Sequence, residues 1–368
     1  MSGVFLLVNP ARTRRRGVDE AIRSHLDRLG HTVEDIRPTG IDDVAPAITR
    51  ALAADPDPGA VGGSEGATAT DPAAAGTRRL LIAGGDGLVH HALPALAGAD
   101  LEVGIVGVGT GNDFARALDL PAKVAAAVDT ALGPTTPVDL IAATDHPPRA
   151  ATTTDDATAT TAGTTTDGAA AVSAPTTDGT TTAGAAAVSA PTTDGAAADG
   201  AAAGSAAPAY AASVVTGGFS GTVNARANGL RFPPGQQRYT VATLLELPRL
   251  EAVEIHLTVD GEEHELSSAM FAVANTRYFG GGMAICPDAD PTDGLLDVTV
   301  VGPVGALTLA RVLPTVFSGR HVTHPKVTTY RGAEVRIATD SDLWADGEPF
   351  GGQTFTAARG VLHVATTL

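Results

Sequence analysis

Residues 83–87 read Ala-Gly-Gly-Asp-Gly, and residues 107–116 read Gly-Val-Gly-Thr-Gly-Asn-Asp-Phe-Ala-Arg. Each stretch follows a short apolar run, at 80–82 and at 103–106, and each leads into a helix-like segment. Glycines at such a junction let backbone N–H groups turn toward an anion, at the positive end of the helix dipole. One such loop alone could be an ordinary turn, but two of them one repeat apart indicate a cradle for nucleotide phosphates.

The two loops also supply one carboxylate each, from Asp86 and Asp113. Carboxylates beside bound phosphates are what Mg²⁺-assisted phosphoryl transfer uses. Neither loop matches a commoner nucleotide-binding motif. The chain has no Gly-x4-Gly-Lys-Ser/Thr sequence, and no Gly-x-Gly-x-x-Gly opens a helix with an acidic residue about 20 positions further on. A P-loop protein is therefore excluded, and a dinucleotide-binding interpretation is weak.

Strands and helices alternate in the first part of the chain. The apolar pattern predicts strands at 5–8, 32–36, 80–83 and 103–106, and helices at 18–29, 41–53, 88–96 and 112–118. Such alternation is typical of a parallel sheet covered by helices on both faces, with ligands at the carboxyl ends of the strands. We therefore predict a three-layer α/β nucleotide-binding domain at 1–136, with both glycine loops at that edge of its sheet.

From residue 137 onward strands dominate. They are predicted at 138–141, 211–215, 253–259, 263–274, 296–301, 334–338 and 361–365, with helices at 236–247 and 304–317. Asp260-Gly261 lies between two of these strands, which is a hairpin signal. We therefore predict a mostly antiparallel β-sandwich domain at 137–368.

A low-complexity tract at 142–208 interrupts this second domain. It consists mainly of Ala, Thr, Gly and Asp, and the sequence of 168–179 is repeated at 184–195. Because the tract has almost no large apolar side chains, burial cannot offset the entropy cost of ordering it. We expect a disordered insert between two strands, and a shorter disordered loop at 54–76.

The composition is acidic, with a net charge of −17 at pH 7 over 368 residues. This charge argues against a nucleic-acid partner, which needs a basic surface. Only Lys123 and Lys326 are lysines, and an acidic, lysine-poor chain suggests a halophilic protein from a cytosol at high salt. The one basic cluster, at 12–16, is either a solvated loop or a contact for phosphate or lipid headgroups.

Cys286 is the only cysteine, which excludes an internal disulfide and a cysteine-based zinc site, and we expect it in the core. No run of 18 apolar residues occurs, so no transmembrane segment is expected. The apolar run at 5–8 is too short for a secretory signal. These features predict a cytoplasmic protein.

Further motifs follow one another in a fixed order. They are Asn9-Pro10 after the first strand, Gly84 to Gly87, Gly109 to Arg116, Gly217-Gly218-Phe219, Asn275, Gly280 to Gly282, Pro287, Asp293 to Asp297, and Asp346-Gly347-Glu348. This series resembles the diacylglycerol kinase catalytic-domain family, which includes bacterial lipid kinases and sphingosine kinases. The chain departs from the usual pattern at 11–17, Leu88, His90, His91 and Gly107, although Leu88 and His90 fit the sphingosine kinases.

The resemblance implies ATP and Mg²⁺ as cofactors and an active site in the cleft between the two domains. It implies nucleotide binding by Asn9, Gly84, Gly85, Asp86, Gly87, Leu88, His90, Gly109, Thr110, Gly111, Asn112 and Asp113. It also implies a Mg²⁺ held by the Asp293 carboxylate and by backbone carbonyls of Asp290 and Leu295, an oxygen-only set that suits this ion. An acidic turn in an acidic protein would equally explain that cluster.

The catalytic base is either Glu348 or Asp86. A base must accept the proton of the acceptor hydroxyl. Glu348 matches the proton acceptor of bacterial members, whereas sphingosine kinases are described with an Asp at the position of Asp86. Without the resemblance, Asp346-Gly347-Glu348 is simply a β-turn signal.

His90 and His91 are adjacent in a predicted helix, where neighbouring side chains point about 100° apart. We therefore expect one of them to face the cleft and the other the helix surface, and we expect no metal pair.

Taken together, the sequence predicts an ATP-dependent lipid kinase, a phosphotransferase that acts on a hydroxyl of a diacylglycerol-like or long-chain lipid. The resemblance implies a place in lipid metabolism and phospholipid biosynthesis, with the enzyme peripheral to the membrane when it meets its substrate. Two alternatives stay open: an NAD kinase-like enzyme with a soluble acceptor, and a non-catalytic lipid- or nucleotide-binding protein. The sequence does not identify the lipid, and it leaves the oligomeric state open, with a homodimer as one option.

Overall fold

The computed structural model describes residues 3–8, 16–54, 78–144, 208–230, 232 and 237–367. Asn9, most of the basic cluster at 12–16, and the expected disordered segments at 54–76 and 142–208, apart from their ends, lie outside this range.

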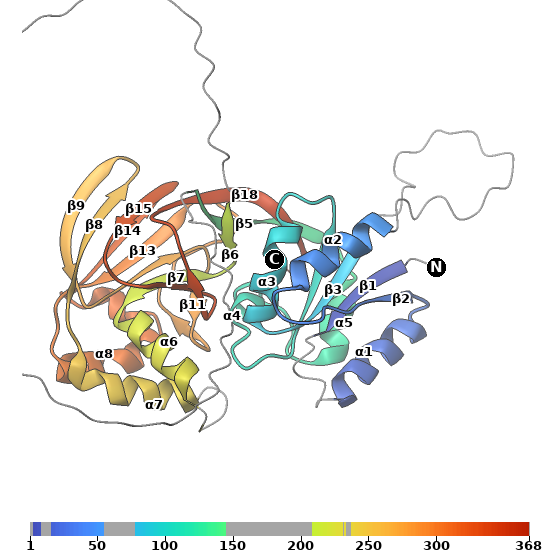
Figure 1. Ribbon diagram of the computed structural model, residues 1–368, viewed down its shortest axis with the longest axis horizontal. Coiled ribbons are helices and arrows are strands. Elements are labelled where there is room, and N and C mark those ends of the chain that lie inside the picture. Colours follow the sequence, from blue (N-terminus) through green and yellow to red (C-terminus); the bar gives the residue numbers. More distant parts are fainter. Residues whose placement is uncertain are drawn as a thin grey trace, which may run out of the picture. The chain divides into compact units, whose positions relative to one another are not determined.

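One large sheet runs through both halves of the described chain (Figure 1). Its parallel part is formed by β1 (Gly3–Val8), β2 (Thr32–Ile36), β3 (Arg79–Gly84) and β4 (Glu102–Gly107), in the order β2-β1-β3-β4. The order continues through β18 (Thr354–Ala365), β15 (Glu334–Ala338), β8 (Val253–Val259) and β9 (Glu262–Ser268). β5 (Thr135–Ala143) pairs with β18, and β6 (Ala209–Ala211) pairs with β5.

Helices cover both faces of the parallel part. Alternate residues of β1 point to opposite faces, as a strand requires. Phe5 and Leu7 share one core with α2 (Val44–Ala54) and α3 (Asp86–Leu96), and Val4 and Leu6 share another with α1 (Arg16–Arg28) and α5 (Val124–Ala131). The predicted three-layer α/β arrangement is thereby confirmed.

A second, wholly antiparallel sheet has the order β14-β13-β10-β7-β16-β17. Its strands are β14 (Val327–Gly332), β13 (Leu296–Val301), β10 (Met270–Ala274), β7 (Val214–Gly218), β16 (Leu343–Ala345) and β17 (Glu348–Phe350). Phe271 and Val298 of this sheet share a buried core with Leu257 and Phe355 of the first sheet. The predicted β-sandwich is therefore confirmed, and one of its two sheets is the continuation of the nucleotide-binding sheet.

Three helices accompany the second sheet: α6 (Phe219–Gly229), α7 (Gln237–Glu246) and α8 (Ala306–Val316). Phe219, Ala242 and Leu309, one from each helix, belong to a common cluster on which Met270 of β10 packs. The remaining elements are α4 (Asp113–Ala117), β11 (Tyr278–Phe279), β12 (Met283–Ala284), and two short 3₁₀ helices at Leu247–Arg249 and Arg320–Thr323.

The structure corrects several predicted elements. The strand expected at 211–215 is two strands, β6 and β7, and the one expected at 263–274 divides into β9 and β10. α6 was missed, because its Gly-, Ser- and Asn-containing sequence has no clear apolar periodicity. β18 begins at Thr354 rather than at 361. It pairs with both β4 and β5, so this last strand belongs to the first sheet. The division into domains at residue 136 stays a prediction.

None of the helices in the described ranges is long and apolar enough to span a bilayer.

Candidate active site

The two glycine loops touch each other backbone to backbone. They follow β3 and β4, which are neighbours in the sheet with Gly84 opposite Gly107. A Cβ atom added to Gly109 would lie 2.4 Å from the Cα atom of Gly85, and one added to Gly85 would lie 2.9 Å from the Cα atom of Gly109. Because no side chain fits at either position, the sequence needs glycine in both loops.

Asn112 holds the second loop in shape. Its backbone is left-handed, with φ of 54°, a conformation that Asn tolerates better than most residues. Its Oδ1 accepts a hydrogen bond from Gly109 N at 2.8 Å, and its Nδ2 donates to Gly109 O at 3.3 Å. Asn112 therefore shapes the loop around Gly109.

Asp86, which is half-buried, and Asp113, which is buried, bring two carboxylates to one place. Asp86 is the first residue of α3, and its Oδ1 accepts a hydrogen bond from Phe114 N at 3.1 Å. Asp113 accepts hydrogen bonds from Gly281 N at 2.7 Å and from Arg116 at 3.1 Å. A Cβ atom on Gly111 would lie 2.8 Å from Oδ2 of Asp86 and 3.5 Å from Oδ2 of Asp113.

Burial and neighbouring negative charges change the acidity of both carboxylates. Burial raises the pKa of Asp86 above its usual range. Burial also raises the pKa of Asp113 to about 6, and the nearby charge of Asp86 adds to the shift. Carboxylates with raised pKa values in one cavity are typical of a functional site.

The turn at 346–348 brings Glu348 to the first glycine loop. Asp346 and Gly347, with φ of 53° and 90°, join β16 to β17 in a hairpin, so the β-turn interpretation is confirmed, and the active-site role of Glu348 stays a prediction. The Asp346 side chain accepts hydrogen bonds from Ala212 N at 2.9 Å and Ser213 N at 3.0 Å. A Cβ atom on Gly87 would lie 3.5 Å from Oε1 of Glu348.

His90 and His91 both contact this turn, which corrects the expectation that one of them faces the cleft and the other the helix surface. Nδ1 of His90 lies 3.1 Å from Oδ2 of Asp346, and Nε2 of His91 lies 3.8 Å from Oε1 of Glu348. The His91 side chain is only 9% exposed, so it is not on the helix surface. Each of the two rings therefore lies beside a different acidic residue of the hairpin.

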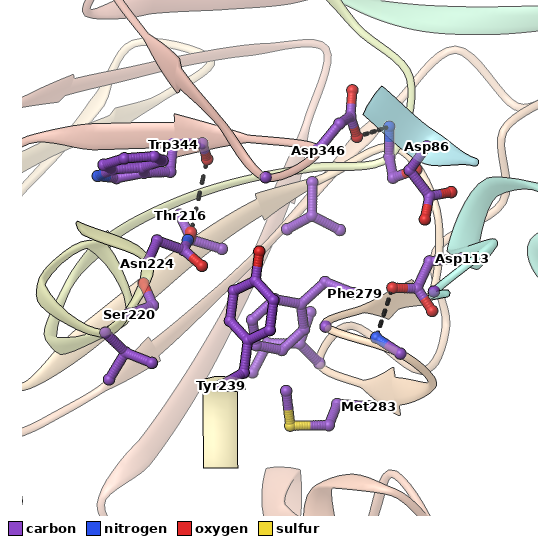
Figure 2. Close-up of a pocket in the computed structure, with 18 of the residues that line it drawn as sticks. Asp86, Asp113, Thr216, Ser220, Asn224, Tyr239, Phe279, Met283, Trp344 and Asp346 are labelled. Carbon is purple, nitrogen blue, oxygen red and sulfur yellow. Dashed lines mark hydrogen bonds between the residues drawn. The ribbon is translucent and has the colours of Figure 1, made fainter. Parts of the chain in front are cut away.

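These groups line one cavity of about 690 Å³ (Figure 2). Of the residues predicted to form the site, Gly85, Asp86, Gly87, Leu88, Gly109, Thr110, Gly111, Asp113 and Glu348 line it. Gly84, His90 and Asn112 support these residues from behind, and Asn9 lies outside the described range. The structure thus brings most of the predicted nucleotide-site residues together.

The cavity continues from the loops toward α6, α7 and α8. There it is lined mainly by Val223 and Asn224 of α6, Tyr239 and Thr243 of α7, Leu309, Val312, Leu313 and Val316 of α8, and Trp344. Tyr239 stands in the middle of this region, and burial raises the pKa of its hydroxyl (Figure 2). The sequence offered no signal for these residues, because they are dispersed over separate elements with no common motif.

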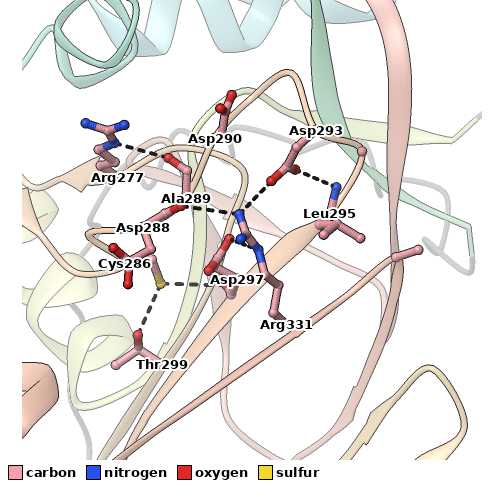
Figure 3. Close-up of polar contacts among 12 residues, drawn as sticks. Arg277, Cys286, Asp288, Ala289, Asp290, Asp293, Leu295, Asp297, Thr299 and Arg331 are labelled. Carbon is pink, nitrogen blue, oxygen red and sulfur yellow. Dashed lines mark hydrogen bonds and ion pairs between the residues drawn. The ribbon is translucent and has the colours of Figure 1, made fainter.

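The predicted metal ligands Asp290, Asp293 and Leu295 lie outside this cavity, in the loop before β13 (Figure 3). Oδ2 of Asp293 accepts a hydrogen bond from Arg331 at 2.6 Å, and Oδ1 accepts one from Leu295 N at 2.9 Å. Arg331 also pairs with Asp297 at 3.2 Å. The guanidinium thus already supplies positive charge to this cluster.

The carboxylates of this loop already take part in hydrogen bonds within the protein. Oδ1 of Asp290 accepts two hydrogen bonds from Thr292, at 3.0 and 2.7 Å, and both oxygens of Asp293 are engaged. Over the described ranges, no three or more His, Cys, Asp or Glu side chains are grouped so as to hold a metal ion. The Mg²⁺ assignment to this loop stays a prediction.

Cys286 is buried, as predicted, and its Sγ lies 3.2 Å from the Thr299 hydroxyl. Burial raises its pKa to about 12, so it is an unreactive thiol.

Comparisons with known proteins agree with this geometry. Residues 3–143 match the family described as Diacylglycerol kinase catalytic domain, and residues 213–365 match the YegS C-terminal NAD kinase beta sandwich-like domain. The chain is 33% identical to a diacylglycerol kinase of Mycobacterium tuberculosis (strain CDC 1551 / Oshkosh) over 75% of this chain and 72% of that protein. It is 26% identical to a probable lipid kinase YegS-like of Pseudomonas fluorescens, over 79% and 78% of the two chains.

A solved structure has the same fold. The crystal structure of a diacylglycerol kinase from Bacillus anthracis str. Sterne superposes with a TM-score of 0.57 at 15% identity, covering 99% of this chain and 97% of that one. At this identity the likeness concerns the fold alone.

Proposed function

The chain belongs to the diacylglycerol kinase family, and we propose from this premise how its site transfers a phosphoryl group to a lipid. Membership makes the protein an ATP-dependent lipid kinase, a phosphotransferase with an alcohol as acceptor. One observation supports the roles of its parts: the glycine loops, Asp86, Asp113 and Glu348 line the same cavity as an apolar chamber between the helices of the second sheet.

The glycine loops bind the phosphates of ATP. Gly85 and Gly109 allow the two loops to pack against each other at the cavity, and the N-terminus of α3 beside them presents its first backbone N–H groups to the anion. Asn112 keeps the second loop in this conformation. This positioning is the larger part of catalysis by kinases, because the donor phosphate needs little covalent help.

Asp86 and Asp113 would hold Mg²⁺ against the donor phosphates. Their carboxylates converge on Gly111, and their raised pKa values reflect two negative charges in a buried place. A magnesium ion prefers such oxygen ligands and, when bound, offsets the charge of the phosphates. The loop that carries Asp293 lies elsewhere, and no step of the proposed reaction passes through it.

Glu348 accepts the proton of the acceptor hydroxyl. The hydroxyl oxygen bonds to the γ-phosphorus, the bond from that phosphorus to the bridging oxygen of ADP breaks, and the proton passes to Oε1 or Oε2 of Glu348. Glu348 suits this role because its side chain is 38% exposed in the cavity beside Gly87. Asp86 is the rival base, but one of its oxygens is held by Phe114 N and the other faces Gly111.

The apolar chamber receives the hydrocarbon part of the acceptor. Val223, Leu309 and Val316 line it, and its polar side is formed by groups such as Asn224 and Tyr239. Such a chamber suits a diacylglycerol-like or long-chain lipid with one free hydroxyl, and a substrate of this kind is met at a membrane surface.

A kinase assay over an acceptor panel tests this function. Purified protein is given ATP and Mg²⁺ at low and at high salt, with diacylglycerol, a long-chain amino alcohol, NAD or no acceptor. We expect phosphorylation of a lipid and none of NAD, and its loss in Asp86→Asn. Phosphorylation of NAD would support a soluble acceptor. ATP binding without turnover on any acceptor would support a non-catalytic protein.

A further inference from the structure

The helices around the acceptor chamber carry a charge opposite to that of the rest of the chain. The described residues of 219–249 and 306–323 include five arginines, at positions 226, 238, 249, 311 and 320, and one acidic residue, Glu246. They therefore contribute +4 to a protein whose net charge is −17, which leaves −21 for all other residues. Moreover, Glu246 is buried and paired with Arg226 and Arg249.

The same segments expose large apolar side chains. Over the described ranges seven such side chains are exposed, and five of them lie here: Phe232 (80%), Leu244 (65%), Leu245 (49%), Leu307 (64%) and Phe317 (55%). A soluble surface normally carries such residues singly and scattered. These exposed apolar side chains are concentrated on the same few elements that carry the arginines. We therefore expect a binding partner to cover them.

α7 and α8 each carry exposed apolar side chains on one side and cavity-lining side chains on another. In α8, Leu307 and Arg311 are exposed four residues apart, and so share one face. The opposite side of α8, with Leu309, Val312 and Val316, lines the cavity. α7 likewise ends with exposed Leu244 and Leu245 while Tyr239 and Thr243 line the cavity.

We propose that Phe232, Leu244, Leu245, Leu307 and Phe317, together with Arg311 and Arg320, form a docking face that lies on an anionic lipid bilayer. Apolar side chains beside arginines are the composition of interfacial helices, because the former enter the headgroup boundary while the latter meet anionic headgroups. The strongly negative remainder of the chain turns this face toward such a surface. This inference rests on the proposed function, because docking here brings the acceptor chamber against the membrane that supplies its lipid.

The salt concentration distinguishes the electrostatic part of this interaction from the apolar part. Charge attraction between exposed groups fades over about 3 Å at 1 M salt, whereas burial of apolar surface persists. We therefore expect the apolar residues to matter at all salt concentrations and the arginines to matter at low salt only.

Vesicle flotation with the full chain tests the docking face. The vesicles contain phosphatidylcholine with or without phosphatidylglycerol, and the variants are Leu307→Ser/Phe317→Ser and Arg311→Glu/Arg320→Glu. The matched controls are Leu29→Ser and Arg37→Glu, whose side chains are exposed in the α/β part. We expect the apolar variant to lose about tenfold or more in vesicle binding at both salt concentrations, and the arginine variant to lose as much at low salt only.

Three results would overturn the inference: wild-type vesicle binding by both variants, an equal loss in the two controls, or a monomer–dimer equilibrium that the apolar variant abolishes without vesicles. The last result would assign the face to a second copy of the chain.

Turnover of a short-chain, water-soluble diacylglycerol without vesicles separates this inference from the proposed function. None of the four substituted residues lines the cavity, so both variants should keep that activity. A wild-type protein that binds vesicles but phosphorylates no lipid would retain the docking face and refute the function.

Discussion

Nε2 of His91 lies 3.8 Å from Oε1 of Glu348, across the boundary between the α/β part and the β-sandwich. His90, one position earlier, lies 3.1 Å from Asp346 in the same turn. Consecutive residues of α3 thus hold both acidic residues of the turn that faces the first glycine loop. The orientation of the proposed base depends on this contact as well as on its own backbone.

Replacing His91 by Phe should lower turnover roughly tenfold to hundredfold, because the imidazole helps to place Glu348 near the acceptor hydroxyl. Steady-state kinetics should show the loss in kcat, with the KM for ATP little changed. His91→Gln, which keeps a hydrogen-bonding group, should recover part of the turnover. If His91→Phe only lowers the melting temperature and leaves kcat intact, the contact is structural.

Glu348→Gln and Asp86→Asn distinguish the two candidate bases. Glutamine keeps the size of Glu348 but cannot take a proton, so turnover should fall by about 10²–10⁴ with ATP still bound. Asp86→Asn should weaken both turnover and Mg²⁺-dependent ATP binding. A Glu348→Gln enzyme with normal turnover on its lipid would exclude Glu348 as the base.

Gly109→Ala should abolish ATP binding and destabilise the fold. Its Cβ atom would lie 2.4 Å from Gly85 Cα and 2.6 Å from Asn112 Oδ1, so the two loops would have to separate. Calorimetric titration with ATP measures the first effect and thermal unfolding the second. Gly17→Ala is the control, because a Cβ atom there meets nothing within 4 Å. Normal ATP affinity in Gly109→Ala would show that the loops are not the phosphate site.

Asp113→Asn should stabilise the unliganded protein at neutral pH while it removes activity. The pKa of Asp113 is about 6 in the folded protein and near 4 when unfolded. The folded state therefore holds its proton more tightly, and the contribution of Asp113 to stability is lost as pH rises from about 4 through about 6. At pH 7 the substitution should raise the free energy of unfolding by roughly 1–3 kcal/mol.

Denaturant unfolding at pH 4 and pH 7 measures this effect, with exposed Asp27→Asn as the control. The gain from Asp113→Asn should be larger at pH 7 than at pH 4. An equal gain at both values would mean that the charge of Asp113 is not the cause.

Replacing residues 145–207 by a short Asn-Gly turn should leave the melting temperature and the activity nearly unchanged. Ala143 of β5 pairs with Ala209 of β6, so the two ends already stand side by side in an antiparallel ladder. The entropy of closing a loop changes slowly with its length, and a tight turn suits such a pair. Failure of the shortened chain to fold would reveal a structural role of the replaced segment.

The local parts of this protein follow from its sequence. Glycines at 84–87 and 109–111 predicted the loops, because only residues without a side chain permit backbone contacts as close as that between Gly85 and Gly109. The alternation of apolar residues predicted β1, β3 and β4, since a strand buried on both faces needs apolar side chains throughout. The parallel sheet and the antiparallel second sheet could therefore be predicted, as could most of the loop residues that line the cavity, and the family resemblance added the proposed base.

The contacts between segments that are distant in the sequence could be found only in the tertiary structure. No sequence pattern indicates that β18 returns to β4, that His91 meets Glu348, or that Arg331 takes the carboxylate of Asp293. The acceptor chamber likewise consists of side chains from several separate elements, and Val223, Tyr239 and Leu309 among them belong to no motif. Local preferences act between neighbours in the chain, whereas these contacts depend on how two sheets pack, and only the folded chain determines that packing.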